Sequence, residues 1–399
     1  MTGLLIRGGR VVDPANALDA VCDVRLREGV VLEIGERLED SGRETVVEAA
    51  GAVVAPGFVD MHVHLRQPGF PEKETLESGT EAAVRGGFTS IACMPNTKPA
   101  LDDPEVLRAL IRETARRGRC RVYPIGAITR GRAGREPCDF AALAGAGAVA
   151  FSDDGDSVES GSVLLDAALR ALDVSGAFIS HCVPEDELVS RDLRIAAESG
   201  KAWHIAHVST RAALDAIRSA RAGGVRVTCE VTPHHLTFTS ALRETFGPAA
   251  TVNPPLRTQD DVEAMRAGVR DGTIDVFASD HAPHTDLEKR RPNDAAPGFS
   301  GLEVAVGAYA AALPGLPVAR FVELLSTNPA RILGLRAGTL SLGAPADLTI
   351  FADRAWTVDP AAFASLGKCT PFAGRALPRQ VLATIVGGDI RYRAPDVAP

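Results

Sequence analysis

The sequence predicts an α/β protein whose main body is a (β/α)8 TIM-type barrel, with a small flanking β-sandwich built from both chain ends. Between residues 57 and 280, eight short apolar runs alternate with helical segments, an order that favours a parallel sheet closed into a barrel. Strand-like runs without helices between them precede this region and follow it, and the two sets can pair. We therefore predict a barrel domain over residues 56–337 and a sandwich domain over residues 1–55 and 338–399.

The individual elements follow from local patterns. The runs LLIRGGRVV (4–12), CDVRL (22–26) and VVLEIG (30–35) lie close together with turn residues between them, which is typical of antiparallel strands. Residues 104–117 are predicted to be a helix, because Asp103 can cap it, Pro104 suits its first turn and Gly118 ends it. After the last helix, ADLTIF (346–351) and VLATIVGGDIRYR (381–393) return to strand character. The barrel strands are expected at 57–64, 88–94, 121–128, 148–154, 177–182, 203–209, 225–231 and 274–280.

The composition excludes some classes of function. The chain has 399 residues, of which 45% are hydrophobic, and a formal net charge of −8. This charge argues against a nucleic-acid partner, which would require a basic face. The chain shows neither a signal sequence nor an apolar run of roughly 18 residues, so we expect no membrane partner and a cytoplasmic location. Seven scattered cysteines are consistent with reduced thiols.

Two histidines in the first barrel strand raise the question of a metal site. His62 and His64 are two positions apart, so on a strand they face the same side with Cα atoms about 6.6 Å apart. Both imidazoles can then reach one ion, each at about 2 Å. The pair alone is ambiguous, because either histidine could instead be a hydrogen-bonded core residue.

Further potential ligands end four other predicted barrel strands. His181, His207 and Asp280 end the fifth, sixth and eighth runs, while Asp153 and Asp154 end the fourth. The carboxyl ends of the strands form the active-site face of a (β/α)8 barrel, so these side chains are expected on one rim. Imidazole and carboxylate ligands suit zinc-type ions. The sequence therefore predicts a site for one or two divalent ions, with Zn2+ as the cofactor.

A set of sequence blocks occurs in a specific order along the chain: DMHVHLRQPG, MPNT, SDDG, HIAHVST, EVTPHHL, NPPLR and DHAPH. Together they resemble the blocks of the amidohydrolase superfamily and, within it, of the dihydroorotases. The resemblance covers most of the barrel, and GAPADLTIF is similar to the closing strand of the superfamily. It implies a zinc-dependent hydrolase that reversibly cyclises N-carbamoyl-L-aspartate to L-dihydroorotate in pyrimidine synthesis.

The resemblance also implies which residues bind the metal. Many relatives bridge two metals through a carboxylated lysine at the end of the fourth strand, but none of the five lysines of this chain lies there. The run FSDDG resembles the branch that uses an aspartate instead. Distances along the chain favour Asp154 over Asp153 as the bridge, and strand alternation leaves Asp153 to cap the following loop. The expected ligands are His62, His64, Asp154, His181, His207 and Asp280.

Catalytic and substrate-binding roles follow from chemistry together with the resemblance. A bound divalent ion lowers the pKa of water to about 7, so that a hydroxide can attack the ring amide. Asp280 is expected to accept the proton of this nucleophile and to pass it to the leaving nitrogen. Arg66 is expected to bind a substrate carboxylate through two hydrogen bonds. The other expected substrate contacts are Asn96, His284, Asn253 and the backbone around Gly298 and Phe299.

Four remaining histidines carry different expectations. His204 points inward by phase and is expected to be a hydrogen-bonded core residue. His234 and His235 begin a loop, where a structural role and a substrate contact remain equally open. His281 is expected to hold its neighbour Asp280 in place.

Two other functions remain open at this stage. One is a different cyclic amidohydrolase, such as a hydantoinase or allantoinase, but Arg66 and Asn96 are suited to a carboxylate and count against it. The other is a non-catalytic dihydroorotase-like scaffold for aspartate transcarbamoylase, which would be expected to lack ligands. Aspartate transcarbamoylase also remains a candidate partner of an active enzyme, and we expect a homodimer. The connection from His181 to His207 looks shorter than is usual in the family, and the sequence leaves open whether residues 280–299 form a lid.

Overall fold

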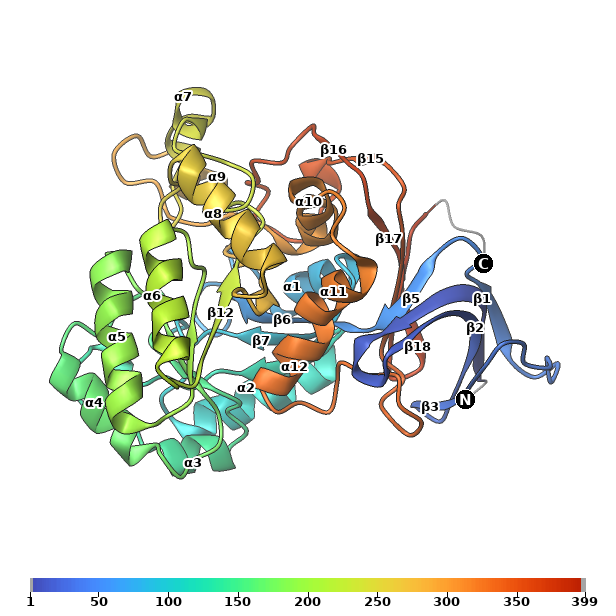
Figure 1. Ribbon diagram of the computed structural model, residues 1–399, viewed down its shortest axis with the longest axis horizontal. Coiled ribbons are helices and arrows are strands. Elements are labelled where there is room, and N and C mark those ends of the chain that lie inside the picture. Colours follow the sequence, from blue (N-terminus) through green and yellow to red (C-terminus); the bar gives the residue numbers. More distant parts are fainter. Residues whose placement is uncertain (1–2, 396–399) are drawn as a thin grey trace.

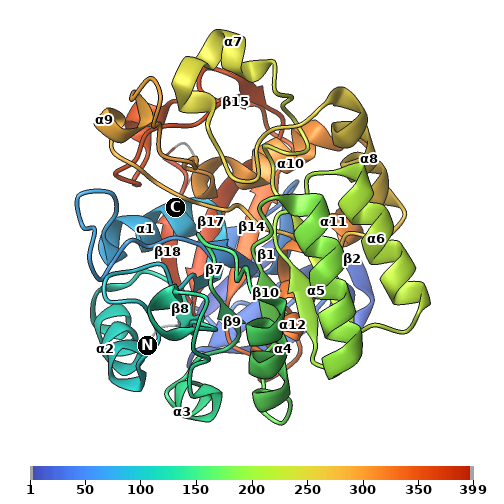
Figure 2. The same cartoon turned by 90° about the vertical axis from the view of Figure 1, so that its left-hand side faces the viewer.

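The computed structural model describes residues 3–395 and places a barrel beside a β-sheet (Figure 1). The barrel and its helices occupy the left of that view, and the sheet lies on the right, next to both chain ends. Seen from the barrel side, the helices surround the strands (Figure 2). Within residues 3–395, no helix has both the length and the apolar character that a membrane span requires.

Eight parallel strands form the barrel wall. Strands β6–β8 pair in one sheet and strands β9–β13 in another, each in sequence order. Single parallel bridges join the two sheets, from Gly126 to Phe151 and from Val63 to His281, and so close the barrel. The strands are β6 (Phe58–Val63), β7 (Phe88–Cys93), β8 (Arg121–Pro124), β9 (Phe151–Ser152), β10 (Phe178–Ser180), β11 (Trp203–Ile205), β12 (Val227–Val231) and β13 (Val276–Phe277).

These strands lie where the sequence predicts them, but most are shorter. The fourth expected run, residues 148–154, keeps only Phe151 and Ser152 in the ladder. The backbone leaves the sheet at the polar residues that follow, which frees their side chains to turn toward the rim of the barrel.

Helices follow the strands and cover the outside of the barrel. Helix α2 (Pro104–Arg117) has the predicted limits, because Asp103 Oδ1 accepts a hydrogen bond from the Glu105 amide at 2.7 Å and Gly118 follows the last turn. The other helices of this layer are α1 (Leu76–Arg85), α3 (Phe140–Gly145), α4 (Gly161–Arg170), α5 (Glu185–Ser199), α6 (Arg211–Ala222), α8 (Gln259–Arg270), α10 (Ala305–Ala312), α11 (Val318–Val322) and α12 (Asn328–Ile332). Two short helices lie in loops, α7 (Leu242–Phe246) and α9 (Asp286–Lys289).

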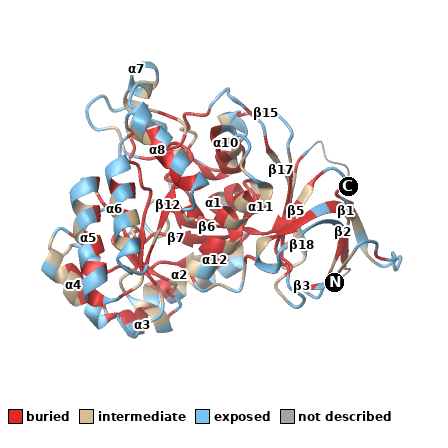
Figure 3. Cartoon of the chain, in the orientation of Figure 1, coloured by how far each residue is buried: buried red, intermediate tan, exposed pale blue. Residues whose placement is uncertain are grey.

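The residues of the barrel strands are largely buried (Figure 3). Apolar side chains pack on both faces of these strands. Phe58, Phe88 and Phe178 are fully buried in the cluster that includes the helices. Burial of one such side chain stabilises the fold by roughly 1.5–3 kcal/mol. A second cluster, which includes Met61 and Val276, comes from alternate strand positions and fills the interior. The polar residues at the carboxyl ends of the strands therefore lie directly above an apolar barrel interior.

Both chain ends contribute to the flanking sheet. Strand β5 (Val53–Pro56) pairs antiparallel with β14 (Leu348–Ala352), so residues about 290 positions apart lie side by side. The order is β18-β17-β14-β5-β1-β2-β3, with β4 beside β1, and a separate apolar cluster forms its core. The remaining strands of the sheet are β1 (Leu4–Asp13), β2 (Leu18–Arg27), β3 (Val30–Gly35), β4 (Thr45–Glu48), β17 (Gln380–Val386) and β18 (Asp389–Arg393).

Part of the C-terminal segment packs on the barrel instead of joining this sheet. Strands β15 (Trp356–Thr357) and β16 (Ala376–Leu377) pair only with each other. Phe363 and Phe372, which lie between them, pack in one cluster with Phe238 and Phe299 from the barrel loops. The boundaries predicted between the sandwich domain and the barrel domain, at residues 55/56 and 337/338, stay a prediction.

Candidate metal-dependent active site

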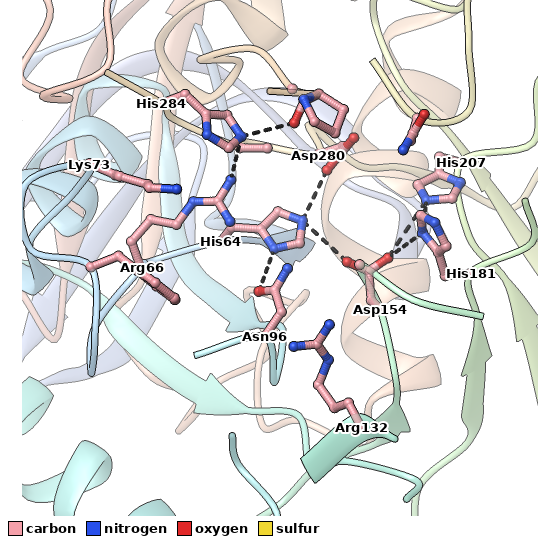
Figure 4. A pocket seen from close by; sticks show the side chains of 16 residues that line it. His64, Arg66, Lys73, Asn96, Arg132, Asp154, His181, His207, Asp280 and His284 are labelled. Carbon is pink, nitrogen blue, oxygen red and sulfur yellow. Dashed lines mark hydrogen bonds and ion pairs between the residues drawn. The ribbon is translucent and has the colours of Figure 1, made fainter. Parts of the chain in front are cut away.

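A cavity of about 290 Å³ opens at the carboxyl ends of the barrel strands (Figure 4). Its lining comes from the segments that follow all eight strands. The expected site residues that line it are His64, Arg66, Asn96, Asp154, His181, His207, Asn253, Asp280, His284 and Gly298.

His62 and His64 converge with Asp280 on one side of the site. His64 Nε2 lies 3.2 Å and His62 Nε2 lies 3.5 Å from Asp280 Oδ1. The ligand atoms of these three buried side chains all lie within 4.8 Å of one another. The alternation of β6 thus delivers both imidazoles to the same point, as the HxH spacing predicts.

Asp154 lies between this group and the other two histidines. Asp154 Oδ1 is 3.3 Å from His64 Nε2, and Asp154 Oδ2 is 3.4 Å from His62 Nε2. The same Oδ2 atom is 2.8 Å from His181 Nδ1 and 3.7 Å from His207 Nε2. The carboxylate of Asp154 is therefore shared by four imidazoles.

Asp153 turns away from this cluster. Its Oδ1 atom accepts hydrogen bonds from the amides of Ile128 at 2.8 Å and Thr129 at 3.0 Å, and its Oδ2 atom accepts one from the Thr129 hydroxyl. Asp153 thus holds the loop that follows β8. Gly155, next to Asp154, has a positive φ of 93°, and a Cβ atom there would lie 2.9 Å from Asn96 Nδ2, so a larger residue would collide with the rim.

A buried glutamate that sequence reasoning missed orients two histidines. Glu230, on β12, places Oε1 2.6 Å from His62 Nδ1 and Oε2 3.2 Å from His204 Nε2. Its Oε1 atom also accepts a hydrogen bond from the His207 amide at 3.2 Å. Because His62 donates from Nδ1, its Nε2 lone pair is left for an ion. The available signal was a lone carboxylate inside an otherwise apolar strand.

The electrostatics of the cluster favour a cation at its centre. Burial alone would lower the pKa of His62, but Asp154, Glu230 and Asp280 raise it well above its ordinary value. Burial alone would raise the pKa of both aspartates, but the surrounding histidines hold them lower. Burial would likewise raise the pKa of Glu230, yet His62 and His204 lower it to about 2. These carboxylates are therefore ionised at neutral pH.

The donor set fits a divalent metal. Within the described part of the chain, His62 Nε2 and His207 Nδ1 are buried atoms without a hydrogen-bond partner, and His62 Nε2 points at the two aspartates. A second group of potential ligands, His62, Asp154 and His207, overlaps the first through His62. Imidazole nitrogens and carboxylate oxygens at a common point are the ligands that zinc-type ions take in proteins. The residues present can hold one such ion or two.

Arg66 forms an anion-binding corner beside the metal ligands. Its guanidinium is buried, and burial lowers its pKa to about 10. Arg66 donates to the Pro283 carbonyl at 3.1 Å, and Arg66 Nη2 lies 3.1 Å from His284 Nε2. No carboxylate of residues 3–395 lies within 4 Å of this cation. Its remaining hydrogen-bond capacity is directed to the cavity (Figure 4).

Asn96 and His284 complete this corner. The Asn96 Oδ1 atom lies 2.9 Å from His64 Nδ1, which leaves the Asn96 amide nitrogen free to donate. Burial and the nearby Arg66 lower the pKa of His284 to about 3, so its ring is neutral. A guanidinium, an amide N–H and a neutral imidazole therefore share one wall of the cavity.

Of the other three expected substrate contacts, two line the cavity and one does not. Asn253 and Gly298 line the cavity. Gly298 has a positive φ of 136°, and a Cβ atom there would lie 2.6 Å from Ala282, so its backbone can face the cavity only as glycine. Phe299 does not line the cavity, because its buried ring packs against His234 at a centroid distance of 5.3 Å. A backbone contact at Phe299 stays a prediction.

His204 and His235 have hydrogen bonds to neighbouring residues, whereas the role of His234 stays open. His204 hydrogen-bonds Thr228 and Glu230, as expected of a core histidine. His235 contacts Thr232 and the Pro254 carbonyl, while His234 Nε2 is buried without a partner.

The expectation for His281 is wrong. No hydrogen bond joins its ring to Asp280. His281 Nε2 instead lies 3.3 Å from Glu74 Oε2, and its Nδ1 accepts a hydrogen bond from the Gly301 amide. The ring therefore points outward into a neighbouring network, which the sequence position next to Asp280 cannot reveal.

Two cations in the cavity wall were also missed. Arg132 and Lys73 both line the cavity; in Figure 4, Lys73 lies near Arg66 and Arg132 lies below Asn96 and Asp154. Arg132 pairs with Asp156, and Lys73 Nζ lies 2.7 Å from Glu288 Oε1. Arg132 belongs to a loop whose composition suggests only a flexible turn, so no sequence signal distinguished it.

Three of the expected site residues have left-handed backbone conformations, as does the cavity-lining Arg132 with a φ angle of 56°. The φ angles are 61° for Arg66, 33° for His207 and 45° for Asp280. Such conformations cost a non-glycine residue roughly 1–3 kcal/mol and persist where the surrounding structure enforces them. They are concentrated here at the carboxyl ends of β6, β11 and β13.

Comparison with known proteins places this geometry in a family. The family model described as Dihydro-orotase-like matches residues 51–192. A dihydroorotase of Pelotomaculum thermopropionicum is 45% identical, with 97% of this chain and 98% of that protein covered. A dihydroorotase of Syntrophus aciditrophicus is 41% identical, with 98% and 99% covered.

The chain belongs to the dihydroorotase family. This confirms the resemblance inferred from the ordered sequence blocks and, with it, the prediction of a cyclic amide hydrolase of the metal-dependent amidohydrolase superfamily.

Solved structures confirm the predicted architecture of a barrel with a flanking β-sandwich. The L-hydantoinase (dihydropyrimidinase) from Arthrobacter aurescens superimposes with a TM-score of 0.90 at 24% identity, over 100% of this chain and 98% of that chain. A D-hydantoinase (dihydropyrimidinase) from Thermus sp. gives 0.85 at 21% identity, over 99% and 97%. At these identities the likeness concerns the fold.

Proposed function

We propose that this dihydroorotase-family protein interconverts N-carbamoyl-L-aspartate and L-dihydroorotate in pyrimidine synthesis. The observation that carries the proposal is the buried Arg66 guanidinium, which has no carboxylate partner among residues 3–395 and lies beside the metal-ligand cluster. Burying such a charge is costly unless an anion compensates it. The exocyclic carboxylate of dihydroorotate supplies that anion next to a ring amide.

The metal ligands we propose are the six residues predicted from sequence. His62, His64 and Asp280 would hold one ion, His181 and His207 a second, and Asp154 would lie between them. We propose Zn2+ for its preference for imidazole and carboxylate. When bound, such an ion acidifies a water molecule and polarises a carbonyl oxygen.

The chain's own residues then handle binding and proton transfer. Arg66, Asn96 and His284 would fix the exocyclic carboxylate, while Asn253 and the backbone at Gly298 and Phe299 would meet the ring amides. In the ring-opening direction, Asp280 accepts the proton of the attacking water and returns it to the leaving amide nitrogen. Its low pKa keeps it ionised and therefore ready to accept.

Two alternative functions predict different behaviour. A hydantoinase-type enzyme would act on neutral rings and would leave Arg66 without an anion. A non-catalytic scaffold for aspartate transcarbamoylase would not need the six ligands, all of which are present in the cluster. Homodimer formation, association with aspartate transcarbamoylase and a cytoplasmic location belong to the proposal as well. The location is supported by the unpaired state of the seven cysteines, which suits a reducing compartment.

The test is metal analysis together with a ring-opening assay on the purified protein. L-dihydroorotate, hydantoin and allantoin are offered in parallel to the wild type and to Arg66→Gln. Bound zinc and turnover of dihydroorotate alone, with loss of that turnover in Arg66→Gln, is the expected result. Preferential turnover of hydantoin or allantoin would replace the proposed substrate, and metal binding without any turnover would favour the scaffold.

A further inference from the structure

We propose that Lys289 is a positioning residue that ties together the substrate-binding loops and thereby sets the affinity for substrate more than the rate of the chemical step. This inference rests on the proposed function. Lys289 is the last residue of α9, in the loop that follows the expected ligand Asp280.

The contacts of the Lys289 ammonium group are unusual for a lysine. The residue is 2% exposed, and Nζ donates to the carbonyl oxygens of Thr251 at 2.9 Å, Ala296 at 2.8 Å and Gly298 at 2.8 Å. Nζ also lies 5.0 Å from the centroid of the Phe299 ring. No carboxylate of residues 3–395 lies within 4 Å of it. Three carbonyl dipoles therefore take the place of a counter-ion.

These carbonyls belong to two different loops of the cavity wall. Thr251 precedes the lining residue Asn253 by two positions, in the loop after β12. Gly298 itself lines the cavity, in the loop after β13, and its amide also donates to the Thr251 carbonyl at 3.1 Å. A single cation thus fixes the spacing between the two backbone segments proposed to meet the ring amides.

The neighbouring residue extends this connection to a third loop. Glu288 Oε1 lies 2.7 Å from Nζ of Lys73, a cavity-lining residue in the loop after β6. Helix α9 is therefore bound on both sides. These contacts join α9 to the loops that follow β6 and β12.

The energetic cost of burying the Lys289 ammonium group indicates that its hydrogen-bond donors have a specific role. Burial lowers the pKa of Lys289 to about 8, which measures the cost of keeping it protonated. An apolar side chain would fill the space without that cost. What the apolar side chain could not supply is a set of donors that converge on three backbone carbonyls from two loops.

Lys201 provides a matched control within the same chain. Its Nζ donates to the carbonyls of Ala171 at 2.7 Å and Val174 at 2.5 Å, and it lies 5.9 Å from the Phe178 ring centroid. Lys201 is buried, and burial lowers its pKa to about 8 as well. It differs in place, because its partners connect α4 to β10 at the opposite end of the barrel and none of them lines the cavity.

The experiment compares Lys289→Met with Lys201→Met in the zinc-loaded full-length protein. Thermal unfolding, zinc content, kcat and KM for L-dihydroorotate are measured, together with amide hydrogen exchange of residues 249–255 and 295–300 without substrate. We expect Lys289→Met to raise KM about tenfold, with kcat within threefold of the wild type and faster exchange in both segments. Lys201→Met is expected to lower Tm while leaving KM and both segments unchanged.

Specific outcomes overturn the proposal. A Lys289→Met protein whose Tm falls as in Lys201→Met but whose KM stays within twofold of the wild type would make Lys289 purely structural. A loss confined to kcat would instead assign Lys289 to the chemical step and would equally reject a role in substrate affinity. If Lys289→Met does not fold, Lys289→Gln, which keeps one amide donor, takes its place in the same comparison. Failure of the wild type to open dihydroorotate would reject the proposed function instead, and KM would then be measured with the cyclic amide that is turned over.

Discussion

Replacing Glu230 by glutamine should weaken metal binding without disturbing the fold. Glutamine can keep its oxygen at the Oε1 position, where it still accepts from His62 Nδ1 and from the His207 amide. Its amide group then faces His204, which can accept because its other ring nitrogen contacts the Thr228 hydroxyl. The substitution therefore removes the negative charge and little else.

The size of the effect follows from that charge. Glu230 is ionised at neutral pH, because its pKa is about 2, and it raises the basicity of His62. Loss of a residue that orients a metal ligand typically costs 10–100-fold in metal affinity, or about 1.4–2.8 kcal/mol. We expect Glu230→Gln to raise the dissociation constant for Zn2+ by this factor, and loss of the buried Glu230–His62 pair to lower the Tm of the metal-free protein as well.

Competitive titration of the metal-free protein with Zn2+ against a chromophoric chelator measures this constant directly. Glu303→Gln is the control, since Glu303 is a partly buried glutamate that accepts from the amides of Ala364 and Ser365 and touches no expected ligand. Zinc affinity within threefold of the wild type in Glu230→Gln would refute the argument. Equal weakening in both variants would show that loss of any buried carboxylate is enough.

Three further predictions concern single residues. Asp280→Asn should keep the fold and lower kcat by at least 100-fold, because the proton acceptor is lost; steady-state assays that find retained turnover would remove Asp280 from this role. Arg132→Gln should raise KM for dihydroorotate about tenfold, since Arg132 lines the cavity, whereas Arg130→Gln, which removes only a surface pair with Glu136, should not; equal KM values would contradict a contact with substrate. Burial raises the pKa of Glu303 from 4.5 to about 7, so its protonated form stabilises the fold below pH 4.5 and this contribution is lost as the pH rises through 7. Glu303→Gln should therefore gain roughly 2 kcal/mol over the wild type between pH 5 and pH 8, visible as a Tm difference that grows with pH, and a constant difference would exclude the raised pKa.

The sequence by itself determined the architecture and the side chains that surround the site. Alternating strand and helix patterns are local properties of the chain. Eight successive strand–helix units predict a closed parallel barrel. His62, His64, His181, His207 and Asp280 could be identified because the active-site face of such a barrel is always formed by the carboxyl ends of its strands. Their convergence follows from topology, which the sequence already contained.

Only the tertiary structure decided which side chains meet across strands. Strand alternation says which face a residue takes, but not which neighbour it contacts, so the Glu230–His62 pair between β12 and β6 was invisible. The different orientations of Asp153 and Asp154 depend on the loop after β8. Two backbone amides and a hydroxyl of this loop donate hydrogen bonds to the Asp153 carboxylate.

The loops show the same limit most clearly. Arg132 and Lys289 lie in segments of ordinary polar composition. The roles of both residues depend on contacts between loops, such as the hydrogen bond from Lys289 to the Thr251 carbonyl and the cavity wall that Arg132 shares with other loops. The expected role of His281 was wrong for the same reason, because a residue next to Asp280 in the sequence need not contact the Asp280 side chain. Periodicity and residue type are local, whereas hydrogen-bond partners and burial are set by the packing of the whole chain, and the chemistry of this site depends on both.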